Sequence, residues 1–426
     1  TTMGTRCSAP ITATASAGRP GAGAADGSRD LSWAPPVVVH PPHQHVVSRA
    51  TAHDVNAFIA IDVHCQTGRW RFKKNGNRML RVEVQLVSST MRSNALLDAL
   101  GRVPRRSLGS SPTPLVRLEN LSRELGREVY VKRDDALGPA AGGNKTRKLE
   151  YLFADAIGKG ADKIATVGGP QSNHARLTAV AARMLGLEPH LLLVGSEPQR
   201  TTGNLLLDQL VDAKLHFISP GPLASRPCTF EELDEYVRDE ASKRVGDHYH
   251  VPIGGSNGLG SLGYVCAALE LEEQAQAIGV TDAWVVVATG SGGTLAGLVA
   301  GLQVIGSSLR LIGIDVAGIW TSYPELVARL ANDALEILGL PARVEAADVS
   351  IIEDTYVGRG YAVPTNEGTD AIKRLAQTEG ILLDPTYTGK AFAGLFDLHA
   401  AGHFGNNEPV IFWHTGGLPG LFAERF

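Results

Sequence analysis

The chain has 426 residues, of which 43% are hydrophobic and 20% are charged, and its formal net charge is −4. This length exceeds one compact core, so two domains are expected, and the composition is ordinary for a globular protein. The small net charge gives no electrostatic footprint for nucleic acid or an anionic membrane, and we expect neither as a partner.

The first segment of the chain differs in composition from the rest. Residues 1 to about 45 consist mainly of small residues and proline, with three arginines and two acidic residues. This composition fits an organelle transit peptide better than a domain, because it offers too little apolar surface for a core. We therefore treat residues 1–90 as a low-complexity extension with an import function.

Residues 51–90 give ambiguous signals. Histidines cluster between His40 and His64, but their spacing matches no familiar zinc site, and no metal is expected. The segments 57–65 and 79–87 could be strands. Four cysteines in the chain show neither paired nor metal-like spacing, which indicates free thiols in a reducing compartment.

From about residue 113 the chain alternates apolar runs with segments of helical periodicity. This alternation predicts an α/β fold with parallel sheets flanked by helices. Helices are expected at 146–158, from about Asn173, and at 295–302. Strands are expected at 128–133, 163–168, 190–195, 284–288, 309–316 and 409–414. Although the uncharged run 283–309 is long enough to span a membrane, its glycines and hydroxyls favour a strand, a turn and a helix.

Ligands in such folds bind where strands end, and the loop 168–176 lies at such an end. Its residues Ser172, Asn173 and His174 fall at a helix N-terminus, where free N–H groups favour an anion such as a carboxylate. The alternative, that Ser172 or Asn173 merely caps the helix, has about equal weight from the sequence alone.

A second glycine-rich loop, TGSGGT, follows the strand expected at 284–288. Its glycines let backbone amides curl round a phosphate, and its hydroxyls add donors. No lysine follows, as it would in a Walker loop, and the glycine spacing is not that of a dinucleotide fingerprint. A small phosphate monoester is therefore expected, held by Ser291, Gly292, Gly293 and Thr294.

Lys145 stands behind Gly-Gly-Asn and directly before a helix. A solvated helix start is the ordinary interpretation of a lone lysine. In the company of a phosphate loop and a carboxylate loop, the lysine suggests pyridoxal phosphate, because that cofactor needs a lysine amine for its Schiff base and a phosphate site.

The motifs from about Arg106 to the C-terminus resemble those of the ACC deaminase/D-cysteine desulfhydrase family. They are VKRDD, GGNKTRKLEY, QSNHAR, GGSNGLGSLGY, VPTNEG, LLDPTYTGKAFAGL and HTGGLPGLF. The resemblance implies the tryptophan-synthase-β-like fold, type II of the pyridoxal-phosphate enzymes. It has two domains, each with a mostly parallel sheet flanked by helices. We expect a large cofactor-binding domain at 91–145 and 261–426, a small domain at 146–260, and a homodimer.

The resemblance also assigns roles to residues. Lys145 would form the Schiff base and take the Cα proton of an amino acid, while Asn173 would bind the phenolic oxygen of the cofactor. Ser172 would lie beside the substrate carboxylate with His174 nearby. Tyr361 and Tyr387 match the two active-site tyrosines of the family.

Two further positions separate the activities within this family. Thr388 stands where the deaminases resemble one another in having a glutamate that faces the pyridine nitrogen, and Thr415 stands where they have an apolar residue. Threonine at both positions is similar to D-cysteine desulfhydrase. Because thiolate is a good leaving group, β-elimination needs a weaker electron sink than opening of a cyclopropane.

The resemblance therefore implies a carbon–sulfur lyase that converts D-cysteine to pyruvate, hydrogen sulfide and ammonia. The preference for D over L substrates comes from the family likeness and not from the residues. Alternatives are an ACC deaminase, another D-amino-acid lyase similar to a D-serine dehydratase, and a binding protein that lost the chemistry. Plant-type members of the family suggest mitochondria as the destination, with a chloroplast or the cytoplasm as alternatives.

Overall fold

A computed structural model describes residues 46–50, 57–62, 71–73, 85–225 and 227–423. Clustering of contacts divides the chain into two compact units, Thr1–Ser88 and Ser89–Phe426. The first unit contains an antiparallel sheet in the order β1-β2-β3. Its strands are β1 Val46–Ala50, β2 Ala57–Asp62 and β3 Arg71–Lys73. The histidines at 40, 43, 45, 53 and 64 lie outside the described residues.

The strand expected at 57–65 is found over part of its length as β2, but the one expected at 79–87 is wrong where it can be checked. Residues 79–84 lie outside the described part of the chain, and residues 85–87 begin the helix α1, Gln85–Leu100. Further along α1, the buried residues Leu96, Ala99 and Leu100 follow the three- and four-residue spacing of a helix.

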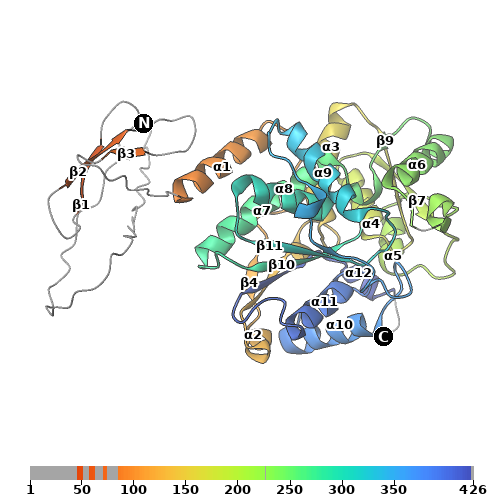
Figure 1. Ribbon diagram of the computed structural model, residues 1–426. Helices are drawn as coiled ribbons and strands as arrows, with labels where there is room; N and C mark the ends of the chain where they lie inside the picture. Colours follow the sequence, from red (N-terminus) through yellow and green to blue (C-terminus); the bar gives the residue numbers. More distant parts are fainter. Residues whose placement is uncertain (1–45, 51–56, 63–70, 74–84, 226, 424–426) are drawn as a thin grey trace, which may run out of the picture. The chain divides into compact units, whose positions relative to one another are not determined.

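The larger sheet of the second unit has six strands in the order β12-β11-β10-β13-β5-β4 (Figure 1). All neighbours are parallel except β4 and β5. The strands are β4 Leu115–Arg117, β5 Val129–Arg133, β10 Trp284–Thr289, β11 Arg310–Asp315, β12 Ile351–Ile352 and β13 Val410–His414. The central strands β10 and β13 are mostly apolar because helices cover both faces of a parallel sheet.

The smaller sheet has four parallel strands in the order β8-β7-β6-β9. They are β6 Lys163–Gly168, β7 Glu188–Val194, β8 Lys214–Ile218 and β9 Tyr249–His250. The two sheets thus draw on different parts of the chain. Both lie in one compact unit, so the domain boundaries placed after residues 145 and 260 stay a prediction.

Helices surround both sheets (Figure 1). They are α2 Glu119–Leu125, α3 Lys145–Gly158, α4 Asn173–Met184, α5 Gly203–Leu210, α6 Phe230–Val245, α7 Gly258–Ala277, α8 Gly293–Ile305, α9 Tyr323–Ile337, α10 Asn366–Glu379, α11 Thr388–Ala400 and α12 Leu418–Leu421. The long uncharged run at 283–309 is therefore β10, a turn and α8. No helix in the described ranges is both long enough and apolar enough to cross a membrane.

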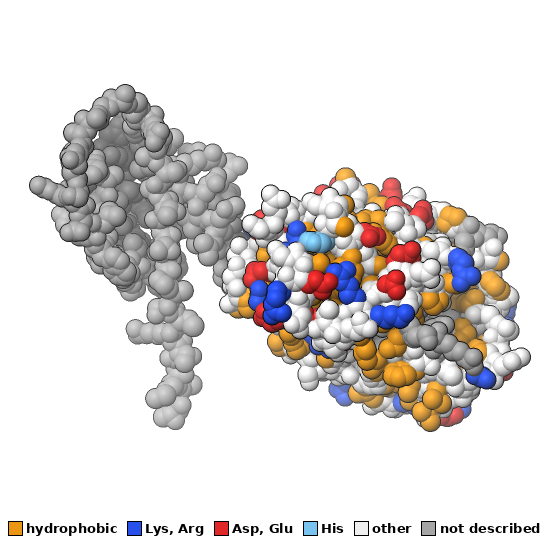
Figure 2. All heavy atoms as spheres, turned by 90° about the horizontal axis from the view of Figure 1, so that it is seen from below, with side chains coloured by type: hydrophobic (Ala, Val, Ile, Leu, Met, Phe, Trp, Pro, Cys, Tyr) orange, Lys and Arg blue, Asp and Glu red, His pale blue; other side chains and the backbone are white. Residues whose placement is uncertain are grey.

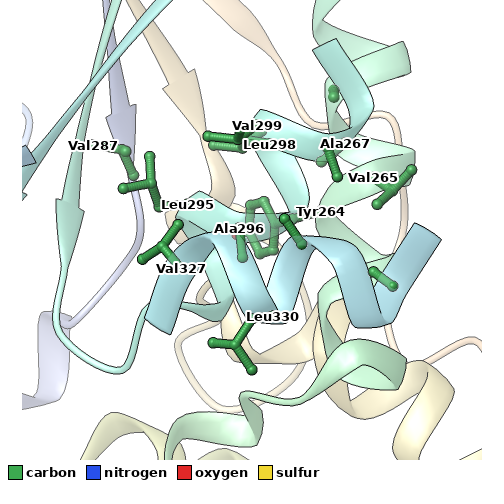
Figure 3. Close-up of a cluster of buried hydrophobic side chains, with 14 of the residues drawn as sticks. Tyr264, Val265, Ala267, Val287, Leu295, Ala296, Leu298, Val299, Val327 and Leu330 are labelled. Carbon is green, nitrogen blue, oxygen red and sulfur yellow. The ribbon is translucent and has the colours of Figure 1, made fainter. Parts of the chain in front are cut away.

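The core beside the larger sheet is formed by α7, α8 and α9, and Figure 3 shows Leu295 between Val287 and Val327. Glycines let α8 approach α7 closely. A Cβ at Gly297 would lie 2.3 Å from the Ser261 carbonyl oxygen, and one at Gly301 would lie 2.5 Å from the Ala268 Cβ. This packing fixes the position of the α8 N-terminus, where the TGSGGT loop ends.

The described surface carries mixed charge. Figure 2 shows acidic and basic side chains interspersed on one face of the second unit. That face therefore has no broad field of a single sign, in line with the small net charge of the chain.

Candidate active site

The loops that follow β6 and β10 open on a common cavity of about 370 Å³. A narrower hollow, here called the side pocket, shares Lys145, Ser291 and Tyr387 with this cavity and is also lined by Asn173 and Thr415. The main cavity is lined by Lys145, Ser172, His174, Ser291, Tyr361 and Tyr387. Most of the residues selected from the sequence are therefore gathered in one place, although they come from distant segments.

Lys145 is the first residue of α3, one position earlier than the sequence indicated. The preceding loop turns through left-handed backbone at Gly142 and Gly143, whose φ angles are 59° and 131°. The Asn144 N–H donates to the Thr415 carbonyl at 2.9 Å, which ties this loop to the end of β13. Burial lowers the pKa of Lys145 to about 8, because desolvation penalises the ammonium form.

The TGSGGT loop contacts two residues that were missed from the sequence, Lys148 and Ser256, and together they form a polar cluster, here called the cradle. The Ser256 hydroxyl lies 2.8 Å from the Ser291 hydroxyl and accepts from the Gly293 N–H at 3.2 Å. The Lys148 ammonium donates to Ser256 at 3.0 Å and to the Gly254 carbonyl at 3.2 Å.

The charge of this cradle suits a phosphate. Lys148 is fully buried, and its hydrogen-bond acceptors are neutral oxygens. Burial and the neighbouring Lys145 lower the pKa of Lys148 well below its usual value. A phosphate in the cradle would favour the charged form of Lys148, and it would also accept from free N–H groups of the α8 N-terminus. A Cβ at Gly293 would lie 3.0 Å from the Lys148 Nζ and would obstruct the approach.

The helix α4 begins in the cavity wall. Ser172 is its N-cap, and the serine hydroxyl accepts from the Ala175 N–H at 3.1 Å. Ser172 therefore caps the helix, and it also lines the cavity. His174 is fixed by Thr166, whose hydroxyl lies 2.8 Å from the imidazole Nε2. Burial, Lys145 and Lys148 lower the pKa of His174 well below its usual value, so the ring is neutral.

Tyr361 and Tyr387 also line the cavity, and their hydroxyl oxygens are 2.5 Å apart. Burial and the contact with Tyr361 raise the pKa of Tyr387 well above its usual value, which keeps its hydroxyl protonated. The loop before Tyr361 is held by Lys390, whose ammonium donates to the Val357 carbonyl at 2.8 Å and the Gly360 carbonyl at 3.3 Å.

The two threonines expected to distinguish the activities lie in different settings. Thr415 lines the side pocket. Thr388 is fully buried, and its hydroxyl donates to the Asp384 carboxylate at 2.7 Å and accepts from the Asp384 N–H at 2.8 Å. The Thr388 hydroxyl is thus engaged with Asp384, four residues earlier in the chain, and its contact with the cofactor ring stays a prediction.

A buried ion cluster supports the helix that carries Lys145. The Arg147 guanidinium lies 2.8 Å from Asp134 and 2.8 Å from Glu270. Tyr264 and Trp413 also donate to Asp134, at 2.6 Å and 2.9 Å. Burial alone would raise the pKa of Asp134, but Arg147 and these two donors lower it to about 2. The sequence analysis gave no indication of this cluster.

Comparison with known proteins gives matches over most of the chain. A sequence model of the family described as "Pyridoxal-phosphate dependent enzyme" matches residues 106–416. A D-cysteine desulfhydrase of Klebsiella pneumoniae (strain 342) is 45% identical over 333 residues, which are 77% of this chain and 98% of that protein. A D-cysteine desulfhydrase of Salmonella choleraesuis (strain SC-B67) is 42% identical with the same coverage.

Among solved structures, one described as an ACC deaminase homologue is 39% identical to this chain, with a TM-score of 0.68. The match covers 77% of this chain and 96% of that structure. The fold and the sequence thus point to the same group of proteins.

Proposed function

The chain belongs to the family of pyridoxal-phosphate dependent enzymes, and from this premise we propose that it converts D-cysteine to pyruvate, hydrogen sulfide and ammonia. The matches confirm the type II fold and the cofactor expected from the sequence. One observation carries the proposed reaction: a desolvated lysine, the Ser291 of the cradle and a tyrosine pair line one cavity in a chain that matches D-cysteine desulfhydrases over 98% of their length.

The site fits pyridoxal phosphate at two points. The amine of Lys145 can bond covalently to the cofactor aldehyde, while the cradle of Ser291, Gly293, Lys148 and Ser256 takes the phosphate. Asn173, in the wall of the side pocket, would donate to the phenolic oxygen. When bound, the cofactor supplies an electron sink for the electrons left behind when the Cα proton of the amino acid is removed.

Lys145 is the base that takes this proton. A lysine with an ordinary pKa would be protonated at neutral pH, but burial lowers the pKa of Lys145 to about 8, which leaves a usable fraction of neutral amine. The substrate carboxylate would lie at the α4 N-terminus, beside the Ser172 hydroxyl. The free N–H groups of the first helical turn stabilise negative charge there.

The tyrosine pair acts at the leaving group. Both tyrosines line the cavity with their hydroxyls 2.5 Å apart, and a phenol O–H can donate to sulfur. We assign to the pair the protonation or positioning of the sulfur as the Cβ–S bond breaks and hydrosulfide leaves. The remaining three-carbon fragment then hydrolyses to pyruvate and ammonia.

A comparison of substrates tests the proposal. Sulfide release from D-cysteine and from L-cysteine is measured beside pyruvate release from β-chloro-D-alanine and ammonia release from ACC. We expect turnover of D-cysteine and β-chloro-D-alanine. Release of sulfide from L-cysteine alone would refute the stereochemical assignment, and faster turnover of ACC would replace the proposed function with that of a deaminase.

The deaminase alternative has one observation in its favour, the 39% identity with a structure described as an ACC deaminase homologue. Against it stands Thr415, which lines the side pocket at a position where an apolar residue is expected in a deaminase. A D-serine dehydratase-like activity is tested by adding D-serine to the same panel.

We further propose that residues 1–90 direct the protein to mitochondria, with a chloroplast as the alternative. The support is compositional, since the first 45 residues are rich in small residues and poor in acids. A fluorescent fusion that lacks residues 1–90 should remain in the cytoplasm. If it still reaches the organelle, the import function is refuted. We also propose a homodimer, which sedimentation of the purified chain tests directly.

A further inference from the structure

Two buried polar side chains and the partly buried Asn173 form a hydrogen-bonded row that leads from Arg176 in α4 to the side pocket. The Arg176 Nε donates to the Asn204 Oδ1 at 2.7 Å, and the Asn204 Nδ2 donates to the Asn173 Oδ1 at 3.0 Å. Arg176 and Asn204 are fully buried, and Asn173 stands in the pocket wall near Lys145. Neither Arg176 nor Asn204 lines the main cavity or the side pocket.

The hydrogen bonds of this row run in one fixed direction from donor to acceptor. Burial lowers the pKa of Arg176 to about 10, so the side chain remains a cation at neutral pH and can only donate. The Asn204 atom that faces Arg176 is therefore an oxygen, and the amide nitrogen of Asn204 points the other way. The same orientation is required by the Gln171 carbonyl, an acceptor 2.9 Å from the Asn204 Nδ2.

Both ends of this arrangement are anchored. The remaining Arg176 donors bind the Ala140 carbonyl and, at 3.1 Å, the Gly142 carbonyl, in the loop that leads to Lys145. The Asn204 N–H donates to the Gln171 Oε1 at 2.9 Å, which holds the start of α5 against the loop before α4. Asn204 is thus restrained at its backbone and at both ends of its amide.

The orientation of the Asn204 amide determines that of the Asn173 amide. An asparagine amide can turn over and exchange its donor and acceptor. Because the Asn204 amide nitrogen already faces Asn173, the Asn173 oxygen is turned toward Asn204, and its NH₂ group is left for the side pocket. A donor at that point stabilises an anionic phenolic oxygen, whereas a carbonyl would favour the protonated phenol.

We propose that Asn204 is a positioning residue that takes its orientation from Arg176 and presents the NH₂ group of Asn173 to the phenolic oxygen of pyridoxal phosphate. This inference rests on the proposed contact between Asn173 and the cofactor. It does not depend on which amino acid is the substrate.

The test compares N204D with N204A, both prepared as holoenzyme. Aspartate keeps an oxygen toward Arg176 but turns an acceptor toward Asn173, so the Asn173 amide must reverse and present its carbonyl to the cofactor. Alanine imposes no polarity, and the Asn173 amide can follow the cofactor. We expect N204A to keep the visible absorption band of the parent, with a Kd for the cofactor about threefold to tenfold higher. N204D should shift absorption toward the shorter-wavelength band of the neutral phenol.

A parental spectrum in folded N204D would overturn the proposal, as would the same spectral shift in N204A, since that would indicate a merely structural role. If N204D does not fold, N204A alone decides: an unchanged cofactor Kd would overturn the inference, and a weakened Kd with the parental band would support it. A parent protein that never binds the cofactor would instead refute the proposed function.

Discussion

Replacing Lys148 with methionine should weaken the binding of pyridoxal phosphate while leaving the binding of pyridoxal, which lacks the phosphate, nearly unchanged. Lys148 is fully buried, and its ammonium donates to the Ser256 hydroxyl and the Gly254 carbonyl. The ammonium therefore meets its opposite charge only when an anion enters the cradle. Methionine fills a similar volume without the charge.

The size of the effect follows from the loss of one charge-assisted hydrogen bond. Such a bond contributes about 1.5–3 kcal/mol, and each 1.4 kcal/mol changes a Kd about tenfold. The Kd for pyridoxal phosphate should therefore rise between about tenfold and about a hundredfold in Lys148→Met. Sulfide release should recover when the cofactor is added in excess, because Lys145 is still present.

The assay is a titration of apoprotein with each cofactor form, followed by visible absorption. Lys159→Met is a matched control, because Lys159 caps the other end of the same helix and its side chain is 65% exposed. The control should bind both forms as the parent does. Equal weakening of both forms in Lys148→Met, or no weakening of either, would refute the phosphate cradle.

Three further predictions follow from the same site. In apoprotein, the rate at which Lys145 captures pyridoxal phosphate should rise with pH and reach half its maximum near pH 8, because the amine reacts only when neutral and its pKa is lowered to about 8. Stopped-flow absorption measures this rate, and a midpoint above pH 10 would contradict the prediction. The pKa of Asp134 is lowered from 3.8 to about 2 in the folded protein, so the ionised carboxylate adds about 2 kcal/mol to the free energy of unfolding. This contribution is present above about pH 4 and is lost as the pH falls through 2. Urea unfolding between pH 5 and 2 should show this loss in the parent and not in Asp134→Asn, and an equal pH dependence in both would count against the cluster. The double variant Thr388→Glu/Thr415→Leu should gain ACC turnover and lose sulfide release, and the idea of a two-residue switch fails if it keeps the full rate with D-cysteine and gains no ammonia release from ACC.

The elements that sequence reasoning found best are the buried parallel strands. β6 coincides with its expected span of 163–168, and β10 extends one residue past 284–288. Apolar runs bounded by glycine predict such strands because both faces are covered. The helix that carries Lys145 was also found to within one residue, since a glycine turn precedes it.

The parts of the site that were missed depend on contacts between residues far apart in the chain. Ser256 reaches Lys148 from 108 positions away in the chain, and Asn204 reaches Asn173 across 31 positions. Spacing in the sequence carries no signal for such contacts. A hint was nevertheless present for Lys148, which lies three residues after Lys145 and therefore on the same side of α3.

Thr388 shows how a motif can place a residue correctly along the chain and leave its contacts open. Its neighbour Tyr387 lines the cavity as the resemblance implied. The Thr388 hydroxyl instead binds Asp384, four residues earlier, at the start of α11. A local hydrogen bond of this kind competes with any role in binding the cofactor.

The most direct measurement of the whole account is made on Lys145→Ala. Purified parent protein, loaded with pyridoxal phosphate, should be yellow, should become covalently labelled at Lys145 on borohydride reduction, and should release sulfide from D-cysteine. The alanine variant should retain no cofactor after reduction and should release sulfide at less than about a thousandth of the parental rate. A variant that still traps the cofactor covalently and still releases sulfide at the parental rate would contradict the assignment of Lys145 and of the reaction built on it.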